Sequence, residues 1–237
     1  MDYKFQNPLR QLPNYGTNQL IDTPFWEKLQ KIISNISEED FIDAEIKDDE
    51  KNVESVEGFG KKIESKLDKE IRESKIIFLD DRKYPEIFHD LFVMVDEYNK
   101  DISQWGYDIC SIEPLQYGVY PKGGFYDWHI DSYESPIWVS SKKRTLSTQQ
   151  NIFNRSSGNW FNRKISLSIF LNDPDEYEGG ELDIETKGPR DDTRYDTFKL
   201  PKGSIVVFPS NKWHRVRPVT SGIRKSLVAW ISGPPVR

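Results

Sequence analysis

The C-terminal stretch GSIVVFPSNKWHRVRPVTSGIRKSLVAWIS (203–232) decides the fold class of this chain. It contains three short runs rich in β-branched and aromatic residues: GSIVVFPS (203–210), KWHRVRPV (212–219) and RKSLVAWIS (224–232). Runs of this length, separated by turn-forming residues, are typical of consecutive β-strands. No helical periodicity interrupts them, so they predict part of a β-sandwich or barrel.

Similar runs continue upstream as far as Tyr107. They are YDICSIEPLQYGVY (107–120), FYDWHID (125–131), KISLSIFLND (164–173), GGELDIE (179–185) and TRYDTFKL (193–200). Gly, Pro or Asn lies at or near the borders of most runs, as expected for short strands joined by turns. Because no helical segment separates them, they extend the predicted sandwich or barrel over the C-terminal half of the chain.

Helical patterns are confined to the N-terminal half. In TPFWEKLQKIISNI (23–36), Thr23 is a candidate N-cap and Pro24 suits the first helical position. Apolar residues recur at helical spacing in KYPEIFHDLFVMVDEYNKDI (83–102), and KIIFLDD (75–81) before it indicates a buried strand. The predicted fold class is therefore mainly β with N-terminal helices (α+β).

Residues 37–75 carry a dense run of charges interrupted by Gly58 and Gly60. We expect a short strand near 41–46 and then a long exposed excursion. A charge run of this kind is more often a solvated loop than an interaction surface, so the first interpretation is preferred and the second stays open.

The composition narrows the possible partners. The chain has 237 residues, 30% of them charged, and a formal net charge of -6, which argues against a general affinity for nucleic acid. It contains one cysteine, Cys110, and neither a run of about 18 apolar residues nor a signal-peptide-like segment near its start. We therefore expect a cytoplasmic protein with no internal disulfide and no membrane contact.

The motif GGFYDWHID (123–131) is a candidate metal site. If it is a strand, His129 and Asp131 point to the same face, because side chains alternate along a strand. An imidazole and a carboxylate can occupy two positions of a divalent metal, and mixed nitrogen and oxygen ligands suit Fe(II). The alternative is a strand histidine with an ordinary carboxylate partner.

Two later residues strengthen the metal interpretation. The chain has three histidines, and His89 lies on the helix predicted over 83–102, so His214 is the candidate third ligand. Ten residues further, Arg224 shares a predicted strand face with Ser226. A buried arginine is costly unless it meets an anion, and a guanidinium beside a hydroxyl suits a carboxylate. Together these residues indicate a metal site with an anion pocket.

Residues 132–162 form the longest stretch without a convincing element. Long loops in compact domains are commonly functional lids or disordered segments. The segment carries the basic residues Lys142, Lys143, Arg144 and Arg155 and the aromatic residues Trp138, Phe153, Trp160 and Phe161, against the single acid Glu134. We interpret it as a cover for an acidic or extended substrate; a solvated loop with buried aromatic residues is the alternative.

The motifs resemble a known family. In LQYGVYPKGGFYDWHID, the residues Tyr120, Gly123, Tyr126, His129 and Asp131 match the block Tyr-x-x-Gly-x-x-Tyr-x-x-His-x-Asp. RKISLSIFLNDPDEYEGGELDI resembles the central strand pair, and PKGSIVVFPSNKWHRVRPVTSGIRKSLVAWISG the distal histidine and cosubstrate arginine region. From Ile76 onward the chain is thus similar to the prolyl 4-hydroxylase-like branch of the Fe(II)/2-oxoglutarate dioxygenases, and most similar to bacterial and phage PKHD-type hydroxylases.

The resemblance implies an architecture. It implies a double-stranded β-helix (jelly roll) core with supporting helices packed on one sheet. We expect a single catalytic domain over 1–237, with an N-terminal annex over 1–75, the core over 76–237 and a lid-like insert over 132–162.

The resemblance also implies roles for individual residues. His129, Asp131 and His214 would bind Fe(II). Arg224 would bind the distal carboxylate of 2-oxoglutarate, with Tyr120 and Ser226 as hydrogen-bond donors. The remaining candidates for catalytic or substrate contacts are Tyr126, expected near the iron, and Trp138, Arg144 and Asn172, of which Asn172 alternatively only starts a turn. Trp213 and Trp230 are expected in the core, and Trp128 behind the sheet.

The implied function is hydroxylation of a substrate, with a peptidyl prolyl residue favoured, and release of succinate and CO2. The implied cofactors are Fe(II) and 2-oxoglutarate, and ascorbate binding is a further expectation from the family. A peptide or protein substrate is the expected partner, without nucleic acid, while the oligomeric state is left open. The alternatives are the same chemistry on a small molecule or a nucleobase, or a non-catalytic, cupin-like metal-binding module.

Overall fold

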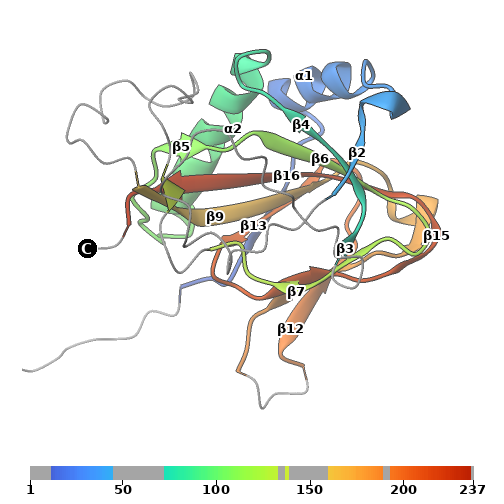
Figure 1. Cartoon of the computed structure of the whole chain (residues 1–237). Helices are drawn as coiled ribbons and strands as arrows, with labels where there is room; N and C mark the ends of the chain where they lie inside the picture. Colours follow the sequence, from blue (N-terminus) through green and yellow to red (C-terminus); the bar gives the residue numbers. More distant parts are fainter. Residues whose placement is uncertain (1–11, 45–71, 133–136, 139–159, 189–192, 236–237) are drawn as a thin grey trace, which may run out of the picture.

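Two facing antiparallel sheets form the body of the protein, and two helices cover the larger sheet (Figure 1). The computed structural model describes residues 12–44, 72–132, 137–138, 160–188 and 193–235. Strands dominate and the longer helices lie before residue 100, so the predicted fold class is confirmed. The sheets do not close on each other, and their arrangement is that of a jelly roll.

The larger sheet has the strand order β1-β13-β9-β16-β6-β4-β2, with β5 pairing β16 and β8 pairing β9. Its strands are β1 (Gly16–Gln19), β2 (Ile42–Asp43), β4 (Lys75–Leu79), β5 (Ser111–Ile112), β6 (Leu115–Tyr120), β8 (Ile137–Trp138), β9 (Trp160–Phe170), β13 (Ser204–Pro209) and β16 (Arg224–Gly233). The long strand β16 lies between β9 and β6, which places its inward side chains in the middle of the molecule.

The smaller sheet has the strand order β12-β11-β14-β7-β3. Its strands are β3 (Arg72–Glu73), β7 (Phe125–His129), β11 (Leu182–Glu185), β12 (Tyr195–Phe198) and β14 (His214–Val216), and a separate pair is formed by β10 (Tyr177–Gly179) and β15 (Val219–Gly222). Apolar side chains from both sheets meet between them, including Phe170, Leu182, Ile184, Val206 and Phe208. This inner layer surrounds the candidate site.

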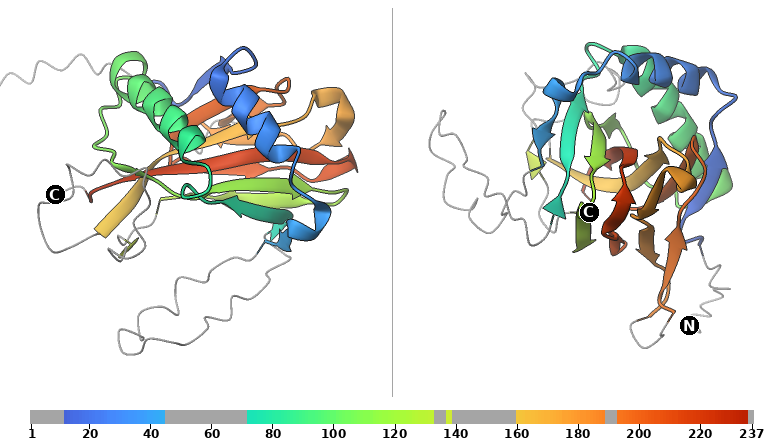
Figure 2. Two further views of the ribbon diagram at one scale, coloured as in Figure 1. Left: turned by 90° about the horizontal axis from the view of Figure 1, so that it is seen from above. Right: turned by 90° about the vertical axis from the view of Figure 1, so that its right-hand side faces the viewer.

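The two helices lie side by side on the outer face of the larger sheet (Figure 2). Helix α1 (Pro24–Ile33) begins as expected, because the Thr23 hydroxyl accepts a hydrogen bond from the Trp26 amide at 3.2 Å. Helix α2 (Pro85–Glu97) buries Ile87, Phe88, Leu91, Phe92 and Val95 in the same core as Leu167 and Leu227 of the sheet. No helix of the described residues has the length and apolarity needed to cross a membrane.

Three short helical turns complete the secondary structure of the described residues. They are the 3-10 turns η1 (Glu38–Asp40) and η5 (Pro174–Glu176) and the π-helical turn η3 (Tyr98–Ile102), which continues α2. The predicted strand near 41–46 is present as β2, while residues 45–71 of the charged excursion lie outside the described residues.

Several strands were not expected from the sequence. The N-terminal stretch contains β1, which pairs with β13, and the turn after β14 contains β15. The insert 132–162 was wrongly predicted to lack elements, because β8 lies within it and β9 already begins at Trp160. Backbone pairing with a neighbouring strand stabilises these segments, and a weak local pattern does not reveal such pairing.

Candidate metal centre and anion pocket

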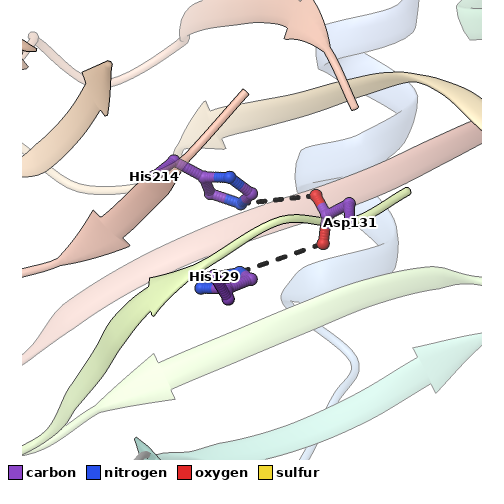
Figure 3. Close-up of side chains that lie close together, drawn as sticks. All are labelled: His129, Asp131 and His214. Carbon is purple, nitrogen blue, oxygen red and sulfur yellow. Dashed lines mark ion pairs between the residues drawn. The ribbon is translucent and has the colours of Figure 1, made fainter. Parts of the chain in front are cut away.

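Two histidines and an aspartate converge between the sheets (Figure 3). His129 at the end of β7 and His214 at the start of β14 lie opposite each other in the antiparallel pair. The Nε2 atom of His214 is 3.3 Å from Asp131 Oδ2, and that of His129 is 3.9 Å from Asp131 Oδ1. One ligand atom from each residue lies within 4.8 Å of the others, so all three predicted ligands come together.

The strand β7 is not regular, and its irregularity shapes the site. His129 pairs with His214 but Tyr126 pairs with Val216, so three steps on β7 match two on β14. This β-bulge brings Tyr126 and His129 to the same face, although residues three apart in a regular strand point to opposite faces. Their rings stack with centroids 3.6 Å apart.

Asp131 reaches the site by a different route from the one expected. Strand β7 ends at His129, so Asp131 lies beyond the strand and the argument from simple alternation does not apply to it. Its amide donates a hydrogen bond to the carbonyl oxygen of Ser210 at 3.0 Å. This backbone contact with the end of β13 turns the carboxylate toward the histidines.

Hydrogen bonds to the backbone orient both imidazoles. His129 Nδ1 lies 2.7 Å from the Asp127 carbonyl oxygen, and His214 Nδ1 lies 3.0 Å from that of Lys212. A ring nitrogen must donate to a carbonyl, so in each neutral ring the Nε2 lone pair is left to face Asp131. Acceptors on three residues then face one another, an arrangement that a cation between them stabilises.

The electrostatics of the site favour the metal-binding protonation states. Burial and the nearby His214 lower the pKa of His129 to about 3, so its ring is neutral at physiological pH. Burial alone would raise the pKa of Asp131, but His214, His129 and Arg163 outweigh it and hold that pKa well below its usual range. Two imidazoles and a carboxylate fit the 2-His-1-carboxylate set that binds Fe(II).

The second part of the site is a buried cation. Arg224 begins β16, is 1% exposed, and donates from Nη1 to Ser226 Oγ at 2.9 Å. Its guanidinium carbon lies 5.1 Å from the ring centre of Tyr120, its partner on β6. Among the described residues it has no ion-pair partner, and its Nε has no hydrogen-bond acceptor. A buried guanidinium in this state is suited to an anionic ligand.

One cavity connects the two parts. Its lining includes the three candidate metal ligands together with Tyr126, Arg224 and Ser226, and also Tyr120, Gln116, Leu167, Ser168, Leu182, Phe208, Val216, Val228 and Trp230. The lining thus combines the candidate metal ligands and the buried arginine with further polar side chains and with apolar ones. A small ligand with a chelating end and an anionic end fits this arrangement.

Asn172 has a different place from the one expected for a substrate contact. It is 4% exposed, its amide donates to the Ile223 carbonyl at 2.8 Å, and its Oδ1 accepts from the Lys225 amide at 2.9 Å. Both hydrogen bonds hold the backbone on either side of Arg224, so Asn172 positions the arginine and does not line the cavity. A strand-end asparagine gives no sequence signal for this distant contact.

The remaining candidates have mixed outcomes. Trp230 is buried as expected, but Trp213 was wrongly placed in the core, because it precedes β14 and is 47% exposed. Trp128 packs on the outer face of the smaller sheet against Tyr195, consistent with its expected place behind the sheet. The backbone of Trp138 is in β8, and Arg144 lies outside the described residues.

Some residues near the site gave no signal in the sequence. The hydroxyl of Tyr177 is buried, has no hydrogen-bond partner among the described residues, and lies close enough to Arg224 for the two side chains to interact. Arg72 on β3 is 7% exposed, and its guanidinium lies 4.6 Å from the ring centre of Tyr126. Arg163 lies 3.9 Å from Asp131. Each approaches the site from another strand, which a single-sequence pattern cannot indicate.

Comparison with protein-family models assigns this site to a class. Residues 115–232, which contain the three ligand candidates and Arg224, match the model of the 2OG-Fe(II) oxygenase superfamily. The chain is similar to this superfamily through that segment, and the family resemblance of its motifs is confirmed.

Individual relatives refine the placement. The chain is 38% identical over 121 residues to a PKHD-type hydroxylase of Teredinibacter turnerae, covering 51% of this chain and 43% of that protein. It is 48% identical over 67 residues to one of Hyphomonas neptunium, covering 28% of each. The matches thus span less than half the length of these curated relatives.

Solved structures support the fold independently. A Pseudomonas putida prolyl-4-hydroxylase aligns with a TM-score of 0.59 at 15% identity, covering 94% of both chains. A Trichoplax adhaerens prolyl hydroxylase in complex with a hypoxia inducible factor peptide fragment aligns with a TM-score of 0.58 at 15% identity, covering 92% of this chain and 83% of that one. The jelly roll of this chain is therefore shared with prolyl hydroxylases.

Proposed function

We propose that this protein is an Fe(II)- and 2-oxoglutarate-dependent dioxygenase that hydroxylates a peptidyl substrate, with a prolyl residue favoured. The observation that carries the proposal is one cavity lined by His129, Asp131 and His214 and by the buried Arg224, which has no ion-pair partner among the described residues. When bound there, Fe(II) with 2-oxoglutarate and O2 supplies the oxidation that converts a substrate C–H to C–OH, with succinate and CO2 as co-products.

Arg224 and its neighbours would bind the distal carboxylate of 2-oxoglutarate. A guanidinium donates through a planar pair of N–H groups, which suits a carboxylate. Ser226 holds one edge of the guanidinium, and Asn172 fixes the backbone before and after it. Gly180 allows close packing, since a Cβ there would lie 3.0 Å from Arg224 Cδ. Tyr120 lines the cavity beside the arginine as a candidate donor.

At the other end, the chain would orient the metal ligands before the metal binds. The carbonyls of Asp127 and Lys212 fix the histidine tautomers, and Tyr126 stacks on His129. Leu182, Val216 and Val228 line the same cavity, and their apolar surfaces would exclude water from the bound ligand.

The substrate proposal rests on the solved relatives and on basic residues. The solved relatives named above are prolyl hydroxylases, and one of them holds a peptide. Arg72, stacked on Tyr126 beside the metal end, and the basic residues Lys142, Lys143 and Arg144 favour an acidic or extended peptide. We further propose a single catalytic domain over 1–237, a cytoplasmic setting, and ascorbate as a reductant that maintains Fe(II).

The first test is an anaerobic titration of the Fe(II)-loaded protein with 2-oxoglutarate, followed by visible absorption. The charge-transfer band of a chelated keto acid should appear, be absent in His129→Ala, and require far more 2-oxoglutarate in Arg224→Ala. A folded protein that binds metal but never shows the band would refute the proposal and favour a cupin-like binding module.

The substrate proposal has its own test, because cosubstrate binding does not depend on it. Neutralising Lys142, Lys143 and Arg144 together should lower the turnover of an acidic prolyl peptide about tenfold, by analogy with the loss of charged contacts at interfaces. The affinity for 2-oxoglutarate should be unchanged. Equal turnover by the variant and the wild type would exclude a role for these residues in substrate binding.

A further inference from the structure

A salt bridge lies directly behind the metal-ligand candidate Asp131. Arg163 on β9 donates from Nε to Glu113 Oε1 at 2.9 Å and from Nη2 to Glu113 Oε2 at 2.7 Å. This is a bidentate pair, in which one edge of the guanidinium is fully used by one carboxylate. Ser232, opposite Arg163 in the sheet, donates to Glu113 Oε1 at 3.1 Å and helps to fix the acid.

The other edge of the same guanidinium faces Asp131. Nη1 of Arg163 lies 3.9 Å from Asp131 Oδ1, about 1 Å longer than a charge-assisted hydrogen bond. Arg163 thus lies between two carboxylates and is held tightly by the one that is not a metal-ligand candidate. The side chains are 14% exposed for Arg163, 29% for Glu113 and 7% for Asp131, so solvent screens their interactions only in part.

The indole of Trp230 limits how Arg163 can move. The guanidinium carbon lies 4.0 Å from the ring centre of Trp230, a cation–π contact with a buried residue that lines the cavity. Arginine stays charged at all relevant pH values and is attracted to the Asp131 carboxylate 3.9 Å away, so loss of Glu113 would remove the bidentate contact that opposes this attraction.

We propose that Glu113 is a positioning residue that holds Arg163 away from Asp131 and so keeps the Asp131 carboxylate available for the metal. Without Glu113, Arg163 closes on Oδ1, occupies its lone pairs and reduces the negative charge that the metal meets. The inference rests on the metal site of the proposed function. It predicts that removing Arg163 repairs the loss of Glu113, which a purely structural salt bridge would not do.

The test is a direct titration of the metal-free full-length protein with Co(II), followed by its visible absorption. Glu113→Gln should weaken Co(II) binding about tenfold, within the range found when residues behind metal ligands are changed. Arg163→Met should bind as tightly as the wild type or more tightly. The double variant Glu113→Gln/Arg163→Met should return to within about threefold of the wild type.

A matched control is Asp96→Asn, which removes a carboxylate paired with Lys100 on the outer helix α2 and should leave Co(II) affinity unchanged. Circular dichroism of each variant checks folding. If Glu113→Gln does not fold, Glu113→Asp keeps the charge, shortens its reach and should weaken binding in the same direction.

Three outcomes are distinguishable. The inference is overturned if the glutamate variant binds Co(II) like the wild type, or if the double variant binds as weakly as Glu113→Gln alone. If the wild type itself does not bind Co(II) through His129, Asp131 and His214, the proposed function fails at the metal site.

Discussion

Asp131 and Asp183 are both buried aspartates of the same half of the molecule, yet their surroundings differ. Asp183 is 0% exposed and lies on the outer face of the smaller sheet, where Thr197, Arg215 and Arg217 donate to it at 2.7, 2.7 and 2.8 Å. Asp131 is 7% exposed, and its ion-pair distances are 3.3 Å to His214 and 3.9 Å to His129 and to Arg163.

The difference separates a structural carboxylate from a ligand candidate. Cross-strand neighbours saturate Asp183, because Thr197 on β12 and Arg215 on β14 lie directly opposite it. Asp131 instead faces imidazole lone pairs, and its nearby arginine is engaged elsewhere. A buried carboxylate without close donors is poised for a cation, whereas one with three close donors already has its partners.

The largest effect is expected when the carboxylate of Asp131 is replaced. Asp131→Asn replaces one ligand oxygen with an amide and should weaken Co(II) binding by more than about 100-fold, more than the changes behind metal ligands cause. Isothermal titration with Co(II) measures the loss, and a cooperative unfolding transition shows that the variant is folded. Retention of wild-type affinity would exclude Asp131 as a ligand.

Asp183→Asn should instead lower the stability and leave the Co(II) affinity unchanged. It leaves Arg215 and Arg217 without their shared carboxylate, and breaking such a buried network costs about 3 kcal/mol of unfolding free energy. Urea unfolding measures this loss, while the Co(II) affinity of the folded variant should equal that of the wild type. A stable variant with impaired metal binding would contradict the division between the two aspartates.

The pH dependence of stability should reflect His129, a metal-ligand candidate beside Asp131. Native His129 has a pKa of about 3, against 6.5 for the unfolded residue, so between these values the unfolded chain binds the extra proton. Stability of the metal-free protein should therefore fall as pH drops from 6.5 toward 3, by up to about 1.4 kcal/mol per pH unit from this residue. Urea unfolding at a series of pH values should show a shallower slope for His129→Gln.

The smallest expected effect concerns Asn172, a buried polar residue that shares features with both aspartates. Asn172 is saturated like Asp183, but its bonds position Arg224. Asn172→Ala should weaken 2-oxoglutarate binding about fivefold through loss of two hydrogen bonds at roughly 0.5–1 kcal/mol each, and leave Co(II) affinity unchanged. An equal effect on both ligands would indicate general loosening of the fold.

The sequence predicted the parts of the site that follow local periodicity. Arg224 and Ser226 share a face of β16 because that strand is regular there, and the motif around His129 marks the ligand region. It did not predict the bulge that brings Tyr126 onto His129, since a register shift depends on the partner strand. It likewise did not reveal Glu113 and Arg163, which are 50 residues apart and meet only in the folded sheet.

Strands upstream of the matched segment also determine how much of the chain is needed for a stable fold. Strands β3 and β4, separated only by Ser74, add to β7 of the smaller sheet and β6 of the larger sheet, outside the segment 115–232. A fragment cut to that segment would expose the hydrogen-bonding edges of β6 and β7, and bare edges recruit other chains. The segment that matches the family model is thus shorter than the segment needed to cover these strand edges. Expression trials should therefore begin upstream of Arg72.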